Sequence, residues 1–139
     1  MSPELLLRIA SVVMFLHLVG HIFGHLTWRK TKDTAKQDVI DRMSQHTFPL
    51  MGAQRSLSQL YDGYGYAAAL TLLFASVLLW VLSRQVLTSA GAVRELTGLI
   101  SVFLFAWGID ELLFFFPFAA AFSLLAAVLS AIAFFGIAQ

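Results

Sequence analysis

Three histidines near the N-terminus recur at a spacing of four residues. His17, His21 and His25 lie in an apolar stretch, so on a helix they form a ladder with ~40° and ~6 Å between successive side chains. Imidazole binds divalent metals, and because it titrates near neutral pH it also accepts and donates protons. The spacing therefore predicts a polar edge on one helix that could serve a metal site, a proton transfer or a hydrogen-bonded contact.

Acidic residues farther along the chain could complete such a site. Asp110 and Glu111 are the only charged residues between positions 96 and 139. Adjacent residues on a helix diverge by ~100°, so the two acids cannot both face one ligand, and Glu111 is taken as the functional one. Asp62 precedes Gly63 at the start of another apolar stretch, where it could equally cap a helix.

Histidine with carboxylates is a workable donor set for a divalent metal, and His21 with Glu111 could move a proton in acid–base catalysis. The expected ligand- or metal-binding set is His17, His21, His25, Asp62, Asp110 and Glu111, with His17, His21 and Glu111 as the metal ligands. The mouth of the pocket is expected at His46, Arg55, Tyr61, Tyr64 and Trp107. Arg55 could instead neutralise an acid, which would make the cluster a structural ion pair.

The same histidines also fit plainer roles. Such a residue on an apolar helix usually donates a hydrogen bond to a carbonyl or carboxylate, and H-x-x-x-H without the Glu of zinc proteases is a weak metal signal. A bis-histidine haem needs histidines on two facing helices, whereas these three share one. The chain has no cysteine, which excludes thiolate metal sites and cysteine nucleophiles. The sequence leaves the cofactor unknown.

Composition indicates what must position these side chains. Of the 139 residues, 59% are hydrophobic and 12% are charged, and the mean hydropathy is +0.81. This composition lies outside the range of water-soluble domains. A spanning helix needs about 20 apolar residues, and residues 4–27, 63–83, 96–116 and 117–138 meet that requirement. The predicted fold is all-α: a polytopic bundle of four transmembrane helices that forms a single domain over residues 1–139.

A polar loop over residues 29–60 separates the first two predicted spans. Ala35, Val39 and Met43 recur at four-residue intervals behind Asp33, which predicts a short amphipathic helix on the membrane surface. Residues 48–52 are expected to form a loop that dips into the headgroups. The turn between the third and fourth spans is placed at Pro117, which suits the first turn of a helix. The alternative places this turn at residues 108–111.

Charge predicts the orientation of the spans. Six of the nine Lys and Arg residues lie in the polar loop, and cytoplasmic loops carry an excess of these residues. The loop is therefore expected in the cytoplasm, with both termini on the outer side of the inner (plasma) membrane. His17, His21 and Glu111 would then lie in the cytoplasmic half of the bilayer. The net charge of +1 and the lack of a basic stripe argue against nucleic acid as a partner.

Small residues indicate where helices can pack closely. Such residues occur at Gly20-x-x-x-Gly24 in the first span and at Ser123, Ala127 and Ala131 in the last. They allow contacts within the bundle or with another subunit of a homo- or hetero-oligomer. The aromatic residues around Phe114–Phe118 could line a pocket for a flat lipophilic ligand or pack against lipid.

The motif HIFGHLTW at residues 21–28, Phe48, Met51-Gly52 and the motif YDGYG at residues 61–65 together resemble a group of small bacterial four-helix membrane proteins. The resemblance covers most of the chain and implies the four-helix topology, with no activity or cofactor attached. In site chemistry alone, a His and Glu pocket in a small helical membrane protein is also similar to the sterol isomerase type of membrane enzyme.

These features predict a membrane-embedded pocket of His, Asp and Glu that binds a lipophilic ligand or a metal ion, in a protein that acts in the lipid bilayer and within a larger complex. Two alternatives stay open. One is an isomerase-like acid–base enzyme with a lipid substrate, and the other is a purely structural accessory subunit. The sequence does not decide whether the protein is an enzyme.

Overall fold

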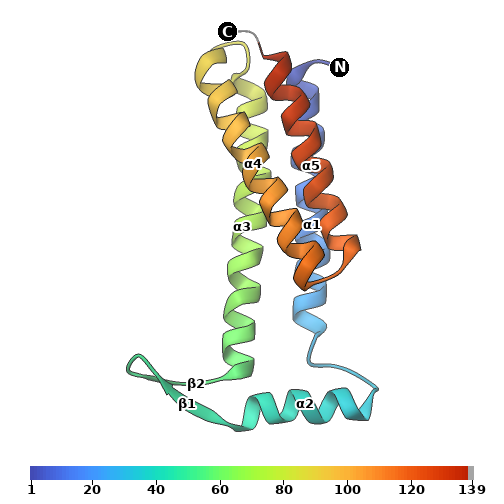
Figure 1. Cartoon of the computed structure of the whole chain (residues 1–139), viewed down its shortest axis with the longest axis vertical. Helices are drawn as coiled ribbons and strands as arrows, with labels where there is room; N and C mark the ends of the chain where they lie inside the picture. Colours follow the sequence, from blue (N-terminus) through green and yellow to red (C-terminus); the bar gives the residue numbers. More distant parts are fainter. Residues whose placement is uncertain (138–139) are drawn as a thin grey trace. The chain divides into compact units, whose positions relative to one another are not determined.

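The computed structural model describes residues 1–137, which form five helices and two short strands (Figure 1). Their order is α1 (Pro3–Thr27), α2 (Thr34–Gln45), β1 (Thr47–Leu50), β2 (Ala53–Ser56), α3 (Leu57–Gln85), α4 (Ala90–Phe114) and α5 (Pro117–Gly136). Residue 138 of the predicted fourth span and residue 139 lie outside the described residues. The chain divides into two compact units: the first unit is Met1–Leu18 with Leu72–Gln139, and the second unit is Val19–Thr71.

Four of the helices in the described chain are long and apolar enough to cross a bilayer. They are α1, α3, α4 and α5, with 25, 29, 25 and 20 residues, and a spanning helix needs about 20. The chain therefore fits a multi-pass integral membrane protein.

The break between α4 and α5 falls at Phe115 and Phe116. Pro117 occupies the first turn of α5, where the N–H group that proline lacks has no helical partner to lose. α4 continues without interruption from Gly108 through Glu111, so the alternative turn at residues 108–111 is wrong.

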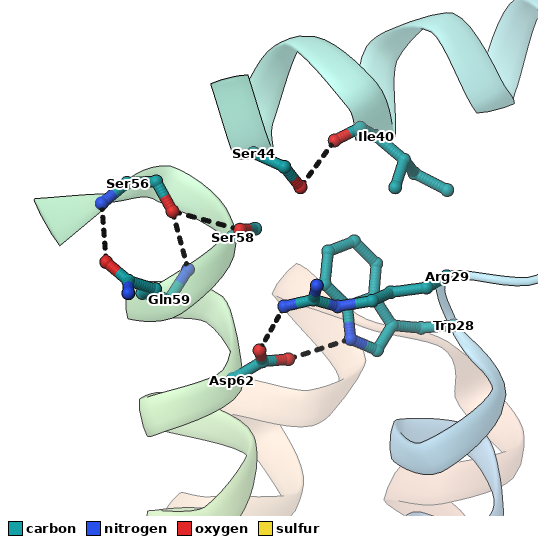
Figure 2. A network of polar contacts seen from close by, with 8 residues as sticks. All are labelled: Trp28, Arg29, Ile40, Ser44, Ser56, Ser58, Gln59 and Asp62. Carbon is teal, nitrogen blue, oxygen red and sulfur yellow. Dashed lines mark hydrogen bonds and ion pairs between the residues drawn. The ribbon is translucent and has the colours of Figure 1, made fainter. Parts of the chain in front are cut away.

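α3 begins at Leu57, six residues before the predicted start at residue 63. The Gln59 N–H donates to Ser56 Oγ at 3.3 Å, and the Ser56 N–H donates to Gln59 Oε1 at 2.9 Å (Figure 2). This reciprocal capping box satisfies two N–H groups at the helix start. As a result, Asp62 lies within α3 and is not its cap.

Small polar residues join α1 and α3 within the first unit. Ser11 Oγ donates to the Ser76 carbonyl at 2.8 Å, and Ser76 Oγ donates to the Ser11 carbonyl at 3.0 Å. Both serines are buried. Such pairs satisfy side-chain hydroxyls while they let two helix backbones approach closely, which is how helices associate in a membrane.

α2 opens the polar part of the second unit. Its N-cap, Asp33, accepts hydrogen bonds from the N–H groups of Ala35 at 2.9 Å and Lys36 at 3.2 Å, as a good N-cap residue does. Ile40 on this helix is buried and Val39 is exposed. The position of α2 on a membrane surface stays a prediction.

The strands β1 and β2 form an antiparallel hairpin where the sequence predicts an irregular loop. Its two-residue turn is Met51-Gly52, with φ of 47° and 89°, and positive φ at both positions is the signature of a type I′ turn. Asn or Asp commonly stands where Met51 does, so the usual sequence signal for a hairpin is missing. The expected irregular conformation of residues 48–52 is therefore wrong, and their position in the headgroups stays a prediction.

Candidate functional site

His17 connects three helices inside the first unit. It lies on α1, is 6% exposed, and places its Nε2 atom 3.1 Å from Glu111 Oε1 on α4. Its Nδ1 atom is 3.2 Å from Ser123 Oγ on α5. Both ring nitrogens of this buried imidazole therefore have polar partners, as a polar group inside an apolar core requires.

Glu111 is buried, and its two carboxylate oxygens have unequal surroundings. Oε1 faces His17 and accepts a hydrogen bond from Trp107 Nε1 at 2.9 Å. Oε2 is buried and has no hydrogen-bond partner within the described part of the chain. A buried acceptor without a donor costs about 1–3 kcal/mol, so this oxygen marks a point where an added donor would be stabilising.

The local sequence of α4 explains this arrangement. Trp107 and Glu111 are four residues apart and share one face of the helix. Gly108 lets α5 approach this region, since a Cβ atom there would lie 2.8 Å from the Leu124 side chain. Asp110 is exposed, because one residue along a helix turns the side chain by ~100°. The two adjacent acids therefore have different environments.

Aromatic rings border the imidazole of His17. The Phe122 ring lies 5.6 Å from it, tilted by 30°, and the Phe118 ring meets Phe122 edge-on at 5.2 Å. Phe118 is exposed. These rings on α5 form a continuous aromatic surface from the helix exterior to the buried histidine.

Ser123 is the site residue that the sequence analysis missed, because it was assigned only to a smooth packing face. It is fully buried, and a hydroxyl in an otherwise apolar helix was the available signal. Ser123, His17 and Glu111 have the residue types of a nucleophilic triad. Ser123 is 0% exposed, and its hydroxyl serves here as the partner of His17 Nδ1.

His21 and His25 pack against α3 within the second unit. His21 Nε2 donates to the Gly65 carbonyl at 2.8 Å, and the His25 ring meets Tyr66 edge-on at 4.8 Å. The two imidazoles stack with 6.0 Å between ring centroids. A Cβ atom at Gly65 would lie 2.2 Å from the His25 ring, so this close contact requires glycine.

Asp62 is held by donors that follow the end of α1 (Figure 2). Its Oδ1 accepts from Trp28 Nε1 at 2.9 Å, and its Oδ2 forms an ion pair with Arg29. The Arg29 guanidinium also lies over the Trp28 ring at 5.2 Å. Asp62 therefore links the end of α1 to the start of α3 in the second unit, and its role in binding a ligand stays a prediction.

The predicted residues of the pocket mouth have separate roles. Trp107 is a direct partner of Glu111, and Tyr61 packs against Trp28 with 4.5 Å between ring centroids. Arg55 donates to the Gln54 carbonyl at 2.9 Å. His46 and Tyr64 are exposed.

Within residues 1–137, no group of three or more His, Asp or Glu side chains is arranged to hold a metal ion. The predicted metal ligands His17, His21 and Glu111 are therefore not assembled as a trio. Glu111 meets His17, while His21 is engaged by the Gly65 carbonyl. The contact that the structure offers for proton transfer is likewise His17 with Glu111, where the sequence predicted His21 with Glu111.

No protein-family model, curated protein or solved structure matches this chain. The chemistry of the site therefore has to be inferred from its own residues. A buried imidazole and carboxylate in contact can bind a hydrogen-bonding ligand, exchange a proton or join helices.

Proposed function

We propose that this integral membrane protein binds a lipophilic ligand that carries a hydrogen-bond donor, at a site formed by His17 and Glu111. The observation that carries the proposal is the buried Oε2 atom of Glu111, which has no donor among the described residues. Ionisable residues inside membrane helices are costly and usually mark function. A hydroxyl or amine group brought by a ligand would satisfy this oxygen.

The surroundings of the pair favour a largely apolar ligand. Phe122 borders His17, and Phe118 extends the aromatic surface outward. Trp107 already donates to Oε1, so Oε2 is the oxygen that lacks a donor and that a donor group of the ligand would satisfy. A compound dissolved in the bilayer would place its apolar body against these rings and one donor on the carboxylate, the usual division of contacts in a ligand site.

The test is purification in mild detergent, followed by native mass spectrometry and identification of the extracted small molecules. We expect the wild-type protein to retain a compound that Glu111→Gln loses. Because Trp107 donates to the first oxygen position, the amide nitrogen of Gln takes the place of Oε2 and repels a donor. Asp110→Asn is the matched control, since Asp110 is exposed on the same helix. Equal retention by Glu111→Gln, or no compound in the wild type, would refute the proposal.

Acid–base catalysis on a lipid is a second function that the same contact favours. His17 Nε2 and Glu111 Oε1 are 3.1 Å apart, within the range for proton transfer. An isomerase-like enzyme would exchange a carbon-bound hydrogen of its substrate with solvent. Incubation of the co-purified compound with the protein in D2O separates the two functions: incorporated deuterium supports catalysis, and an unchanged mass supports binding alone.

A structural accessory role gives a third pattern of results. In that case His17 and Glu111 serve only to join α1, α4 and α5, so His17→Leu and Glu111→Leu lower stability while no compound accompanies the wild-type protein. Stability and bound mass are therefore measured on the same preparations.

We also propose that the polar loop faces the cytoplasm, with α2 on the membrane surface and both termini outside the inner membrane. Six of the nine basic residues lie in the loop, which supports this orientation. The exposed side chain of Val39 gives α2 an apolar contact for lipid. A second subunit would fit against Gly20 and Gly24, which are exposed and have open space at their Cβ positions.

A further inference from the structure

The register of the β1–β2 hairpin gives it two chemically different faces. Phe48 pairs with Arg55 and Leu50 with Ala53, and residues paired across strands share a face while neighbours along a strand alternate. One face therefore carries two large apolar side chains and one arginine. The other face carries Thr47, Pro49, Gln54 and Ser56.

The tip of the hairpin is apolar although the side chain of Met51 is fully exposed. Met51 is 102% exposed, and the neighbouring Leu50 is 40% exposed. The φ of 47° at Met51 favours Asn at this turn position, and contact with water would favour a polar residue as well. Methionine meets neither preference, and an apolar environment around the tip accounts for it.

The aromatic residues at the start of α3 indicate the depth of the hairpin. Trp28 and Tyr61 pack together with 4.5 Å between centroids, as residues of an interfacial belt do. Leu57 is four residues before Tyr61, which is ~6 Å along a helix, and a headgroup layer is about 5–8 Å thick. β2 ends at Ser56, directly before α3, and the hairpin runs sideways from the start of α3 (Figure 1). The hairpin therefore starts within the headgroup layer.

The charge of the segment that contains the hairpin favours anionic lipids. Residues 29–56 hold six Lys and Arg against three Asp. Within residues 19–71, Lys30, Lys32, Lys36 and Arg55 form no ion pair. Arg55 lies on the apolar face, opposite Phe48, where a long side chain can bury its stem and extend its guanidinium to a phosphate.

We infer that the β1–β2 hairpin is a membrane anchor in its own right, with Leu50 and Met51 inserted beneath the anionic headgroups and Arg55 bound to a lipid phosphate. The occupant of this surface is the bilayer that the protein itself spans. The anchor holds the loop segment flat against the membrane beside α3. It depends on none of the residues of the His17 and Glu111 site.

The chain has no cysteine, so single cysteines can report position directly. Met51→Cys and Gln54→Cys, each with a nitroxide label, are compared in nanodiscs of phosphatidylcholine with phosphatidylglycerol. We expect oxygen to collide with the label at position 51 more often than a water-soluble nickel chelate does, and the reverse at position 54 on the polar face. Preferential contact of the position 51 label with the nickel chelate overturns the inference. Shielding from both reagents also overturns it, because a second copy or another protein then covers the tip.

Two further variants test the anchor without a label at the tip. Arg55→Gln removes one cation near the anionic surface and should lower the ratio of inserted to free hairpin by about 5-fold, read from a label at position 50. Met51→Asn suits the turn better and should slow amide exchange of residues 47–56 in detergent. The same variant should reduce the additional slowing that phosphatidylglycerol nanodiscs give. Equal slowing in wild type and Met51→Asn would count against insertion.

Discussion

The packing of the first unit does not by itself require a polar pair at His17 and Glu111. A well-packed apolar pair of similar volume often stabilises a protein as well as a buried ion pair does, or better. Here the pair also leaves Glu111 Oε2 without a donor. Helix packing alone therefore gives little reason for these two residues, whereas a ligand that supplies a donor does.

Single and double replacements of the pair should give very different stabilities. We expect His17→Leu or Glu111→Leu alone to lower the free energy of unfolding by about 3–5 kcal/mol, because each leaves a buried polar partner uncompensated. The double variant should lose much less than the sum of the two. Unfolding in detergent, followed by helical circular dichroism, measures this difference.

His46→Leu is the control for these variants, because His46 is exposed and its loss should change stability by less than about 0.5 kcal/mol. Strictly additive effects of His17→Leu and Glu111→Leu would show that the two side chains do not interact.

The sequence indicated the histidine ladder and the importance of Glu111, but not which histidine meets the acid. Spacing places His17 and His21 on one edge of α1, whereas contacts with other helices decide what each meets. His21 finds a backbone carbonyl, that of Gly65, and every residue has one, so this partner leaves no signal in the sequence. Ser123 was hidden for a related reason, because a serine among alanines also reads as a small packing residue.

At the scale of the elements, the contact between α1 and α3 in the second unit depends on Gly65, which has no side chain. Gly65→Ala would bring a Cβ atom to 2.2 Å from the His25 ring, so the ring must move or the helices must separate. We expect a loss of about 1–3 kcal/mol, measured as a lower midpoint of thermal unfolding.

Gly63→Ala is the matched control two residues earlier in α3. Its Cβ atom would meet nothing within 4 Å, and alanine is the better helix former by about 0.5–1 kcal/mol. The two substitutions should therefore shift the midpoint in opposite directions. A shift of the same sign and size in both would mean that His25 does not pack on Gly65.

The long helices were predictable because an apolar stretch of spanning length has few other options. Their starts were less so. The sequence predicts a third span from residue 96, yet α4 begins at Ala90 and the Arg94 guanidinium lies over the Phe134 ring at 4.4 Å. A cation that stacks on an aromatic ring can be accommodated within a helix. At α3 the capping box of Ser56 and Gln59 was overlooked.

For the molecule as a whole, the number of spanning helices determines on which side of the membrane each connection lies. An arrangement of four spans predicts the loop between α1 and α3 on one side of the membrane and residues 86–89 on the other. We expect a membrane-impermeant maleimide to label Thr88→Cys in intact cells and to label Lys32→Cys only after permeabilisation, because the basic loop should be cytoplasmic.

Val128→Cys controls for access, since Val128 is exposed on α5 and should lie in lipid, beyond the reach of the reagent. The unmodified protein has no cysteine and gives the background. Labelling of Lys32→Cys and Thr88→Cys from the same side would rule out an arrangement of four spans.

Nitrogen-15 solid-state NMR of the histidine-labelled protein in bilayers tests most directly whether the buried side chains of His17 and Glu111 are in contact. The chain has four histidines, and the Nε2 and Nδ1 shifts of an imidazole respond strongly to its hydrogen-bond partners. We expect Glu111→Gln to shift the signals of one imidazole, the one that His17→Gln removes, and Asp110→Asn to leave all four in place. Four unchanged imidazoles in Glu111→Gln would contradict the pair and with it the proposed site.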